Sequence, residues 1–430
     1  MGNQDQDPVS YPQYSSTPIS STGVSSAKIG PFSSFSSINY RWFWLSGFAA
    51  GFTMQMRQIS RGWLVYRMSQ SPLALALTMA SFGVPMTFFS PVGGALADRL
   101  PKRTLIFVSN MLGGLSSLIV AILISQNLIQ LWHLFVIGFL DGILSAFNMP
   151  SRQAIIPSLV SRERLVNAIA LSIGAMNVSR IAAPAMAGVM IPWIGLDGVY
   201  SFMALLNVVA ALTILAINVS GTEPQEWKDW NLSQEVFNGL KYVATNRALL
   251  SVLLLAFVAI VLGMGFQVLL PAFVVEALDG DARDLGSLMA FSGVGAMLGS
   301  LGLAFMGNPL RKGRILLGSI SLWAVAVLVF SVSRNPTLAS GMLLIVGFAT
   351  SVFMSMNMAI MQLLSSKEMY GRVMSISMMT WGLMPLGIIP LSALAAQIGT
   401  PNALAASAVA LVVVSAAFPI FNRTVRELKA

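Results

Sequence analysis

The sequence predicts an all-α integral membrane protein whose twelve transmembrane helices form two repeats of six. Three observations lead to this fold class. Of the 430 residues, 56% are hydrophobic and only 10% are charged, whereas a soluble domain carries about a quarter charged residues. Apolar runs long enough to cross a bilayer recur after residue 40. The two halves of the chain also repeat several local features.

The first 37 residues differ from the rest of the chain. They are rich in Ser, Pro and Gln and contain no apolar stretch. Such a composition cannot bury enough apolar surface to fold and lacks the apolar region of a signal peptide. We therefore expect residues 1–37 to form a disordered cytoplasmic tail.

Twelve apolar runs follow, each near the roughly 20 residues that a helix needs to cross the hydrocarbon core. They lie at 41–66, 73–97, 104–125, 131–156, 165–190, 198–219, 248–275, 285–307, 314–333, 338–363, 371–396 and 402–422.

One long polar link divides these runs into six and six. It spans 220–247, is expected to be cytoplasmic, and is expected to hold an amphipathic helix at 231–246. The predicted organisation is a bundle at 38–219, this linker, a bundle at 248–422 and a cytoplasmic C-terminus at 423–430.

The distribution of basic residues predicts the topology. With the N-terminal tail inside the cell, most Lys and Arg of the links, Arg152 among them, fall on the inner side, and the outer links hold only Arg67, Arg283 and Arg334. This asymmetry favours a multi-pass protein of the cytoplasmic (inner) membrane with both termini in the cytoplasm. It also explains the net charge of +9 without a nucleic-acid partner.

The repeated features predict a transporter architecture. The fourth run ends in NMPSRQ and the tenth in NMAIMQ, so each has Asn and Gln five residues apart, and a basic link follows both the second and the eighth run. Two related six-helix bundles commonly hold a substrate site between them near the bilayer midplane.

The stretch GGALADRLPKR joins the second and third runs. Gly93 and Gly94 allow close approach of neighbouring backbones, Pro101 ends the helix, and Lys102 with Arg103 hold the turn in the cytoplasm. Asp98 is not needed for this turn. An acid at a helix end finds partners in a helix N-terminus or an Arg side chain.

This stretch resembles the signature between spans 2 and 3 of the major facilitator superfamily. The matching residues are Gly94, Asp98, Arg99, Lys102 and Arg103. The family usually has Gly where Pro101 stands, so this turn can differ in geometry from that of the family. The stretches WLVYRMSQSPLALALT and GRVMSIS resemble the exporter branch that includes the enterobactin and macrolide efflux proteins.

The resemblance implies that Asp98 belongs to an inner gate. In the family this acid meets the start of span 11 and a nearby arginine, which would here be Gly371 and Arg372. The link after the eighth run lacks an equivalent acid, so the gate is expected to be asymmetric. The alternative is that Asp98 is part of a topology anchor with no role in the transport cycle.

The resemblance extends to span 5, where the exporter branch places small residues and a Gly-Pro pair. Here Pro184 and Gly188 occupy such positions, among several Ala and Ser residues. Proline bends a helix and small residues permit close packing. The feature favours export, and ordinary tight packing is the alternative interpretation.

Four ionisable residues fall inside the predicted spans: Arg57, Arg61, Asp141 and Arg180. Each costs at least about 2.5–3.5 kcal/mol at bilayer depth on insertion scales. They can form a structural ion pair of Asp141 with Arg180 or Arg57. Alternatively they line a net positive cavity suited to an anionic or acidic amphipathic substrate. Arg61 can instead reach the outer headgroups.

The absence of a Gly-Lys dipeptide excludes a phosphate-binding loop of the ATPase type. Secondary transport remains, and the resemblance implies a proton as coupling ion, with Asp141, the sole mid-membrane carboxylate, as its carrier. We expect a monomeric, proton-coupled efflux antiporter for a small organic or amphipathic, siderophore- or drug-like molecule.

The alternatives are an inward-directed or lipid transporter of the same fold, and a non-transporting scaffold or sensor. No cofactor or metal is expected, because the chain has no Cys and one His. The same lack of reactive groups argues against an enzyme.

Overall fold

The computed structural model is helical throughout the part of the chain that it describes, which comprises residues 30–218, 241–306, 311–366, 369, 373, 376–377 and 382–421. The predicted fold class is confirmed. The first half contains η1 (Ser33–Ser36), α1 (Ile38–Ser69), α2 (Pro72–Arg99), α3 (Lys102–Ser125), α4 (Leu131–Leu159), η2 (Arg162–Arg164) and α5 (Leu165–Leu215). The second half contains α7 (Arg247–Gly263), α8 (Gly265–Leu278), α9 (Ala282–Met306), α10 (Lys312–Val332), α11 (Pro336–Leu364), α13 (Pro385–Ile398) and α14 (Thr400–Phe421).

The helices follow the predicted runs with one difference. The runs at 165–190 and 198–219 both lie in α5, where the non-helical Gly195, with φ 74°, separates two helices within the predicted link. The run at 248–275 is divided into α7 and α8 around Met264. Nine helical segments of the described chain are long and apolar enough to cross a membrane, and α5 counts once among them. Twelve crossings therefore stay a prediction.

Local sequence explains how the first two helices meet. Helix α1 ends at Gln70, which adopts a left-handed conformation with φ 47°. Ser71 then caps α2 by accepting a hydrogen bond from the amide of Ala74, and Pro72 occupies the first helical position. Such a cap and an N1 proline are the preferred start of a helix, so α1 and α2 reverse direction within two residues.

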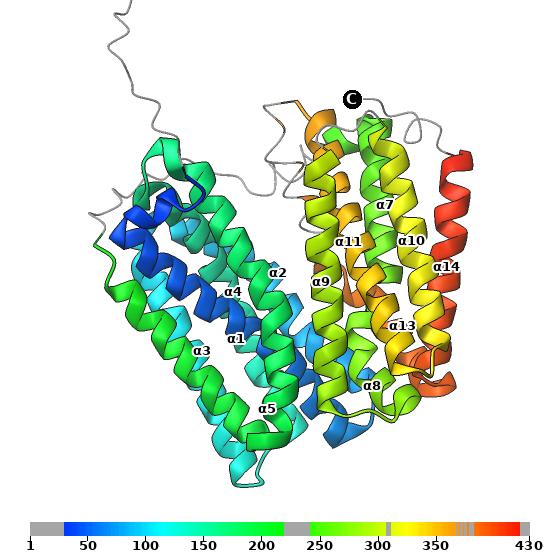
Figure 1. Ribbon diagram of the computed structural model, residues 1–430, viewed down its shortest axis with the longest axis horizontal. Coiled ribbons are helices and arrows are strands. Elements are labelled where there is room, and N and C mark those ends of the chain that lie inside the picture. The colour runs from blue at the N-terminus through cyan, green and yellow to red at the C-terminus, as the bar shows by residue number, and fades with distance from the viewer. Residues whose placement is uncertain are drawn as a thin grey trace, which may run out of the picture.

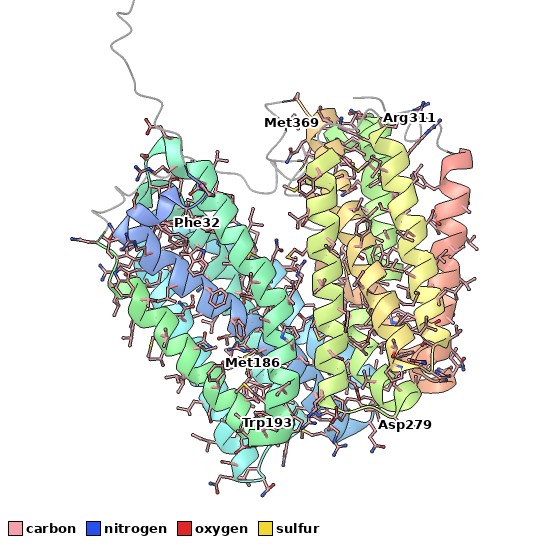
Figure 2. The ribbon with its side chains drawn as sticks, viewed as in Figure 1. Phe32, Met186, Trp193, Asp279, Arg311 and Met369 are labelled. Carbon is pink, nitrogen blue, oxygen red and sulfur yellow. The ribbon has the colours of Figure 1, made fainter. Side chains whose placement is uncertain are left out.

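The helices form two bundles, α1–α5 and α7–α14, that meet at one end and diverge toward the other (Figure 1). Trp193 and Asp279 lie at the converging end, whereas Phe32, Arg311 and Met369 lie at the diverging end (Figure 2). We call these the closed end and the open end. The predicted topology makes the closed end extracellular.

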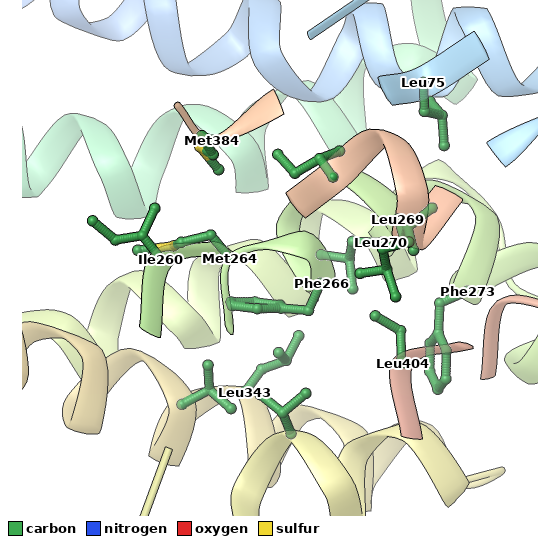
Figure 3. Packing of buried hydrophobic residues seen from close by; sticks show 14 of the residues in the cluster. Leu75, Ile260, Met264, Phe266, Leu269, Leu270, Phe273, Leu343, Met384 and Leu404 are labelled. Atoms are coloured by element: carbon green, nitrogen blue, oxygen red, sulfur yellow. The ribbon is translucent and has the colours of Figure 1, made fainter. Parts of the chain in front are cut away.

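The apolar core explains this shape. One cluster of buried side chains joins the two bundles, and it combines Leu75 of α2 with Leu269, Leu270 and Phe273 of α8 (Figure 3). A separate, smaller cluster, which includes Tyr40, fills the first bundle near its open end. Among the described residues, the continuous core therefore crosses between the bundles toward the closed end.

Ordered structure begins before the bundle boundary predicted at residue 38. The amide of Ser34 donates to Asn167 Oδ1 at 3.0 Å and its hydroxyl donates to the carbonyl of Arg164 at 3.1 Å. Asn167 Nδ2 in turn donates to the carbonyl of Pro31 at 2.7 Å. These bonds attach η1 to the start of α5, so residues 31–37 pack on the first bundle.

The turn between α2 and α3 shows the predicted close packing. A side chain at Gly93 would place its Cβ 2.0 Å from the carbonyl oxygen of Ala146, so only glycine allows α2 to cross α4 there. Pro101 separates the two helices. Arg103 donates a hydrogen bond to the carbonyl of Leu215, at the end of α5, where basic side chains are favoured.

Two glycines form a close helix crossing between the bundles. A Cβ at Gly188 of α5 would lie 2.7 Å from the carbonyl oxygen of Ala282. A Cβ at Gly286 of α9 would lie 2.6 Å from the carbonyl oxygen of Pro184. Gly188 of span 5 therefore serves contact between the bundles, whereas Ser179 packs within the first bundle, where its Oγ lies 3.7 Å from a Cβ placed on Gly51 of α1.

We predict that Gly188→Val weakens closure at the closed end, because overpacking a tight contact costs about 1–3 kcal/mol. The chain has no cysteine, so spin labels can be attached at Arg67→Cys and Arg283→Cys, both exposed at this end. The label distance should lengthen. The control is Gly174→Val on the same helix, where a Cβ meets nothing within 4 Å. An equal response in both variants would contradict the crossing's role.

Candidate functional site

A cavity of about 430 Å³ lies mainly within the first bundle. Its wall is formed by residues of α1, α2, α3, α4 and α5, and residues of α8 and α9 complete it from the second bundle. The volume falls within the range of small-molecule sites. Four charged side chains belong to the wall: Arg57, Arg61, Asp141 and Arg152.

Asp141 holds two arginines in this wall. Arg57 Nη1 lies 2.7 Å from Asp141 Oδ1, and Arg61 Nη2 pairs with Asp141 Oδ2. Ser116 Oγ of α3 adds a hydrogen bond of 3.1 Å to Oδ1. Asp141 is only 3% exposed. The carboxylate thus ties α4 to α1 through both oxygens and to α3 through a hydroxyl.

The sequence places these groups together through helix periodicity and glycines. Arg57 and Arg61 are four residues apart, so they share one face of α1. A Cβ on Gly138, one turn before Asp141, would lie 3.4 Å from Arg61 Nη1, and a Cβ on Gly113 would lie 3.8 Å from Arg57 Nη2. Both glycines leave room for the guanidinium groups. Arg57 is also held by the Gly113 carbonyl at 3.0 Å.

This Arg57–Asp141–Arg61 group carries a net charge of +1 when all three are ionised. Its two ion pairs share one carboxylate, so neutralising or displacing that carboxylate breaks both ion pairs together. Charge-assisted hydrogen bonds are the strong ones inside a protein. The arrangement can therefore respond to a proton or to a competing anion by loosening α1 from α4.

Arg180 does not join this group. It lies exposed on α5 and is not part of the cavity wall, and neither ion pair of the described residues includes it. Its carbonyl oxygen is 3.1 Å from a Cβ placed on Gly293 of α9, so Arg180 stands at the junction of the bundles. Arg61 is buried against Asp141 and does not extend to the headgroups.

The predicted inner gate is described only in part. Lys102 and Arg103 lie at the start of α3. Pro184 and Gly188, which were predicted to serve conformational change, lie instead at the crossing with α9 near the closed end. The other predicted gate residues are not fully described. Gly94, Asp98 and Arg99 belong to α2, but their side-chain positions lie outside the described part of the structure, and Gly371 and Arg372 lie outside it entirely.

Arg152 is a site residue that sequence reasoning assigned to an inner link. It lies within α4 and lines the cavity, where its Nε donates to Asn148 Oδ1 at 2.8 Å. The spacing of four residues between Asn148 and Arg152 was the available signal, because such pairs share a helix face.

A second missed group joins the bundles at the closed end. Tyr66 of α1 donates its hydroxyl to Glu276 Oε1 of α8 at 2.8 Å. The amide of Thr400, at the start of α14, donates to Glu276 Oε2 at 2.8 Å, and its hydroxyl donates to Oε1 at 2.9 Å. Glu276 is exposed. We call these three residues the closed-end clasp.

The sequence matches the family described as transmembrane secretion effector over residues 29–430. It is 22% identical to macrolide efflux protein A of Streptococcus pyogenes, over 85% of this chain and 91% of that protein. It is 22% identical to the staphyloferrin A transporter of Staphylococcus aureus, over 90% and 97% of the two chains. It is 23% identical to the enterobactin exporter EntS of Citrobacter koseri, over 72% and 73%.

Solved structures show the same fold. The nucleoside transporter NupG superposes with a TM-score of 0.76 at 12% identity, over 89% of this chain and 99% of that one. The likeness concerns the arrangement of helices. The chain therefore belongs to the transmembrane secretion effector family within the major facilitator superfamily, a family of membrane transporters and not of enzymes.

Proposed function

We propose that this protein is a secondary active transporter that exports a small organic or amphipathic molecule in exchange for protons, by alternating access. The observation that carries the proposal is the buried Arg57–Asp141–Arg61 group in the wall of a cavity. Ionisable residues at bilayer depth are expensive and mark substrate or proton paths. The protein would act as a monomer in the cytoplasmic membrane.

Export is supported by the names of the relatives. A macrolide efflux protein and an enterobactin exporter are efflux proteins by name, and a staphyloferrin A transporter carries a siderophore by name. These substrates belong to those proteins. For this chain they favour outward transport of a compound of comparable drug- or siderophore-like character.

Alternating access assigns a role to each end of the molecule. With both termini in the cytoplasm, the closed end is extracellular and the cavity faces inward. The bundles at 38–219 and 248–422 then rock about the crossing of Gly188 with Gly286, and the closed-end clasp parts when the protein opens outward. Asp98 would meet Gly371 and Arg372 when the inner side closes.

Asp141 is the proposed proton carrier. A proton on its carboxylate would remove the charge that holds Arg57 and Arg61, so proton entry and loosening of α1 from α4 would be one event. This links the ion gradient to the packing of the first bundle. The coupling needs no cofactor and no metal ion.

The proposal is tested by screening a deletion strain for sensitivity to, and accumulation of, macrolides, siderophores and dyes. The compound with the largest difference in accumulation is then assayed with the purified protein in liposomes under an imposed proton gradient. Higher accumulation in the deletion strain and gradient-driven flux support export. Lower accumulation would indicate uptake, and no flux under any imposed gradient would indicate a scaffold or sensor.

We predict that Asp141→Asn abolishes gradient-driven efflux in these liposomes and preserves downhill exchange. Asparagine keeps the shape of aspartate and an oxygen that accepts hydrogen bonds, but it cannot carry the proton. Removing one partner of a buried ion pair can cost about 3–5 kcal/mol, so Asp141→Glu, which retains a titrating group, is measured beside it and should keep partial coupling.

The matched control is Asp279→Asn, an exposed acid at the closed end whose left-handed conformation asparagine accepts. It should leave gradient-driven efflux unchanged. Full gradient-driven efflux by a well-expressed Asp141→Asn protein would refute the role of Asp141 as proton carrier.

We predict that Tyr66→Phe favours the outward-open state, because it removes one hydrogen bond of the closed-end clasp. This hydrogen bond to an exposed carboxylate contributes about 1 kcal/mol to the closed state. Its loss changes the ratio of the inward-open and outward-open states about fivefold. The spin-label pair at positions 67 and 283 reports this ratio. Tyr242→Phe, which removes a tyrosine hydroxyl bonded to Ser366, is the control, and a shift of the same size there would contradict the clasp.

A further inference from the structure

Arg152 brings a positive charge into the cavity wall without an acidic partner among the described residues. Its Nε donates to Asn148 Oδ1 at 2.8 Å and its Nη2 donates to Ser46 Oγ at 2.9 Å. Its Nη1 is buried and has no hydrogen-bond partner. Neither ion pair of the described chain includes Arg152.

The neutral oxygens around Arg152, and the Phe43 ring whose centroid lies 5.9 Å from its Cζ, satisfy part of its bonding capacity but supply no negative charge. A guanidinium presents five N–H donors in a planar fork that matches a carboxylate. Buried charges in proteins are normally paired, because an unpaired one is costly. The unused Nη1 is therefore a donor that an anion from outside the protein would satisfy.

A second unused donor lies next to it. Asn148 Nδ2 donates to Asn110 Oδ1 at 3.3 Å, and Asn110 Nδ2 is buried without a partner. Asn110, Asn148 and Arg152 all line the cavity. The two unused donors thus belong to one hydrogen-bonded chain, and a carboxylate has enough lone pairs to accept from both.

The rest of the cavity wall is suited to an apolar body. Met54, Met79, Met149, Met176 and Met289 all line it. Methionine is flexible and polarisable and adapts to ligands of irregular shape. The cavity therefore offers a tolerant apolar wall together with a cation, Arg152, that has no ion-pair partner among the described residues.

We propose that Arg152, with Asn110 and Asn148, binds the acidic group of an amphipathic organic acid whose apolar body lies against the methionines. This assignment rests on the proposed function in that it takes the cavity to be the substrate path. The site is separate from the Arg57–Asp141–Arg61 group. Arg152 follows Asp141 by eleven residues, which is about 16 Å along a helix.

Binding is measured on the full-length protein in nanodiscs of phosphatidylcholine, without any gradient. The probes are 7-diethylaminocoumarin-3-carboxylate and its ethyl ester, followed by fluorescence polarisation. The wild-type protein should bind the acid about tenfold more tightly than the ester, and Arg152→Gln should bring the acid to the affinity of the ester. Ester affinity should change less than twofold.

Asn148→Asp is the second variant. It replaces the neutral acceptor of Arg152 Nε with a carboxylate of nearly the same shape, so it should also remove the preference for the acid while keeping the fold. Arg334→Gln, an exposed arginine after α10, is the control and should bind both probes as the wild type does. Added phosphatidylglycerol should not compete, unless the natural anion is a lipid headgroup.

Equal affinity of the wild-type protein for the two probes, or no saturable binding of the acid, would overturn the assignment. Equal weakening of both probes by Arg152→Gln would show a structural role instead. A preference for the acid in a protein that fails to drive efflux would refute the proposed function and retain the anion site. Gradient-driven efflux by a protein that shows no preference for the acid would refute the anion site and retain the proposed function.

Discussion

The first bundle depends on the attraction between one carboxylate and two guanidinium groups. Helix α1 carries Arg57 and Arg61 and is not among the nine helical segments whose composition alone suits a membrane. Each arginine would cost several kcal/mol in hydrocarbon on its own. Asp141 of α4 removes much of this cost by pairing with both, so the burial of the two arginines of α1 depends on one acid on another helix.

The second bundle is built on a different basis. Its core is aromatic and aliphatic, with Trp323, Phe330 and Phe353 fully buried, and it contributes uncharged residues such as Gln267 and Pro271 to the cavity wall. One half therefore holds the described charges of the cavity and the other acts as an apolar wall. Such a division suits movement of one bundle as a unit against the other, with contacts between backbones at the closed end.

Sequence reasoning located the helices, because an apolar run of fixed length is a direct consequence of the bilayer. It placed a link at 191–197, where the structure turns at Gly195, but it missed the division near Met264, because that division lies within apolar sequence and changes the backbone without changing the pattern. It found Arg57, Arg61 and Asp141 because charges in apolar runs are rare. It could not exclude Arg180 as a partner, because that requires knowing how α5 is rotated.

The remaining site residues had weaker signals. From the sequence, Arg152 is assigned to a loop because it is basic and lies two turns from the end of α4. Only the structure shows that it lines the cavity. Tyr66 and Glu276 are separated by 210 residues, and no local pattern relates them. Contacts between the bundles are the least predictable part of such a chain, since they depend on the docking of two units that each satisfy their own apolar pattern.

Taken together, the proposed anion site and proton carrier constrain the energetics of transport. At about 16 Å and an effective dielectric constant of about 20, an anion at Arg152 would favour a proton on Asp141 by only about 1 kcal/mol. The two ligands are therefore nearly independent within one state, and exchange must come from opposite preferences of the inward- and outward-open states. The membrane potential contributes more free energy than this coupling. Moving one anion out and one proton in transfers two charges, each worth about 2.3 kcal/mol per 100 mV, so an interior-negative potential drives both steps in the direction of export.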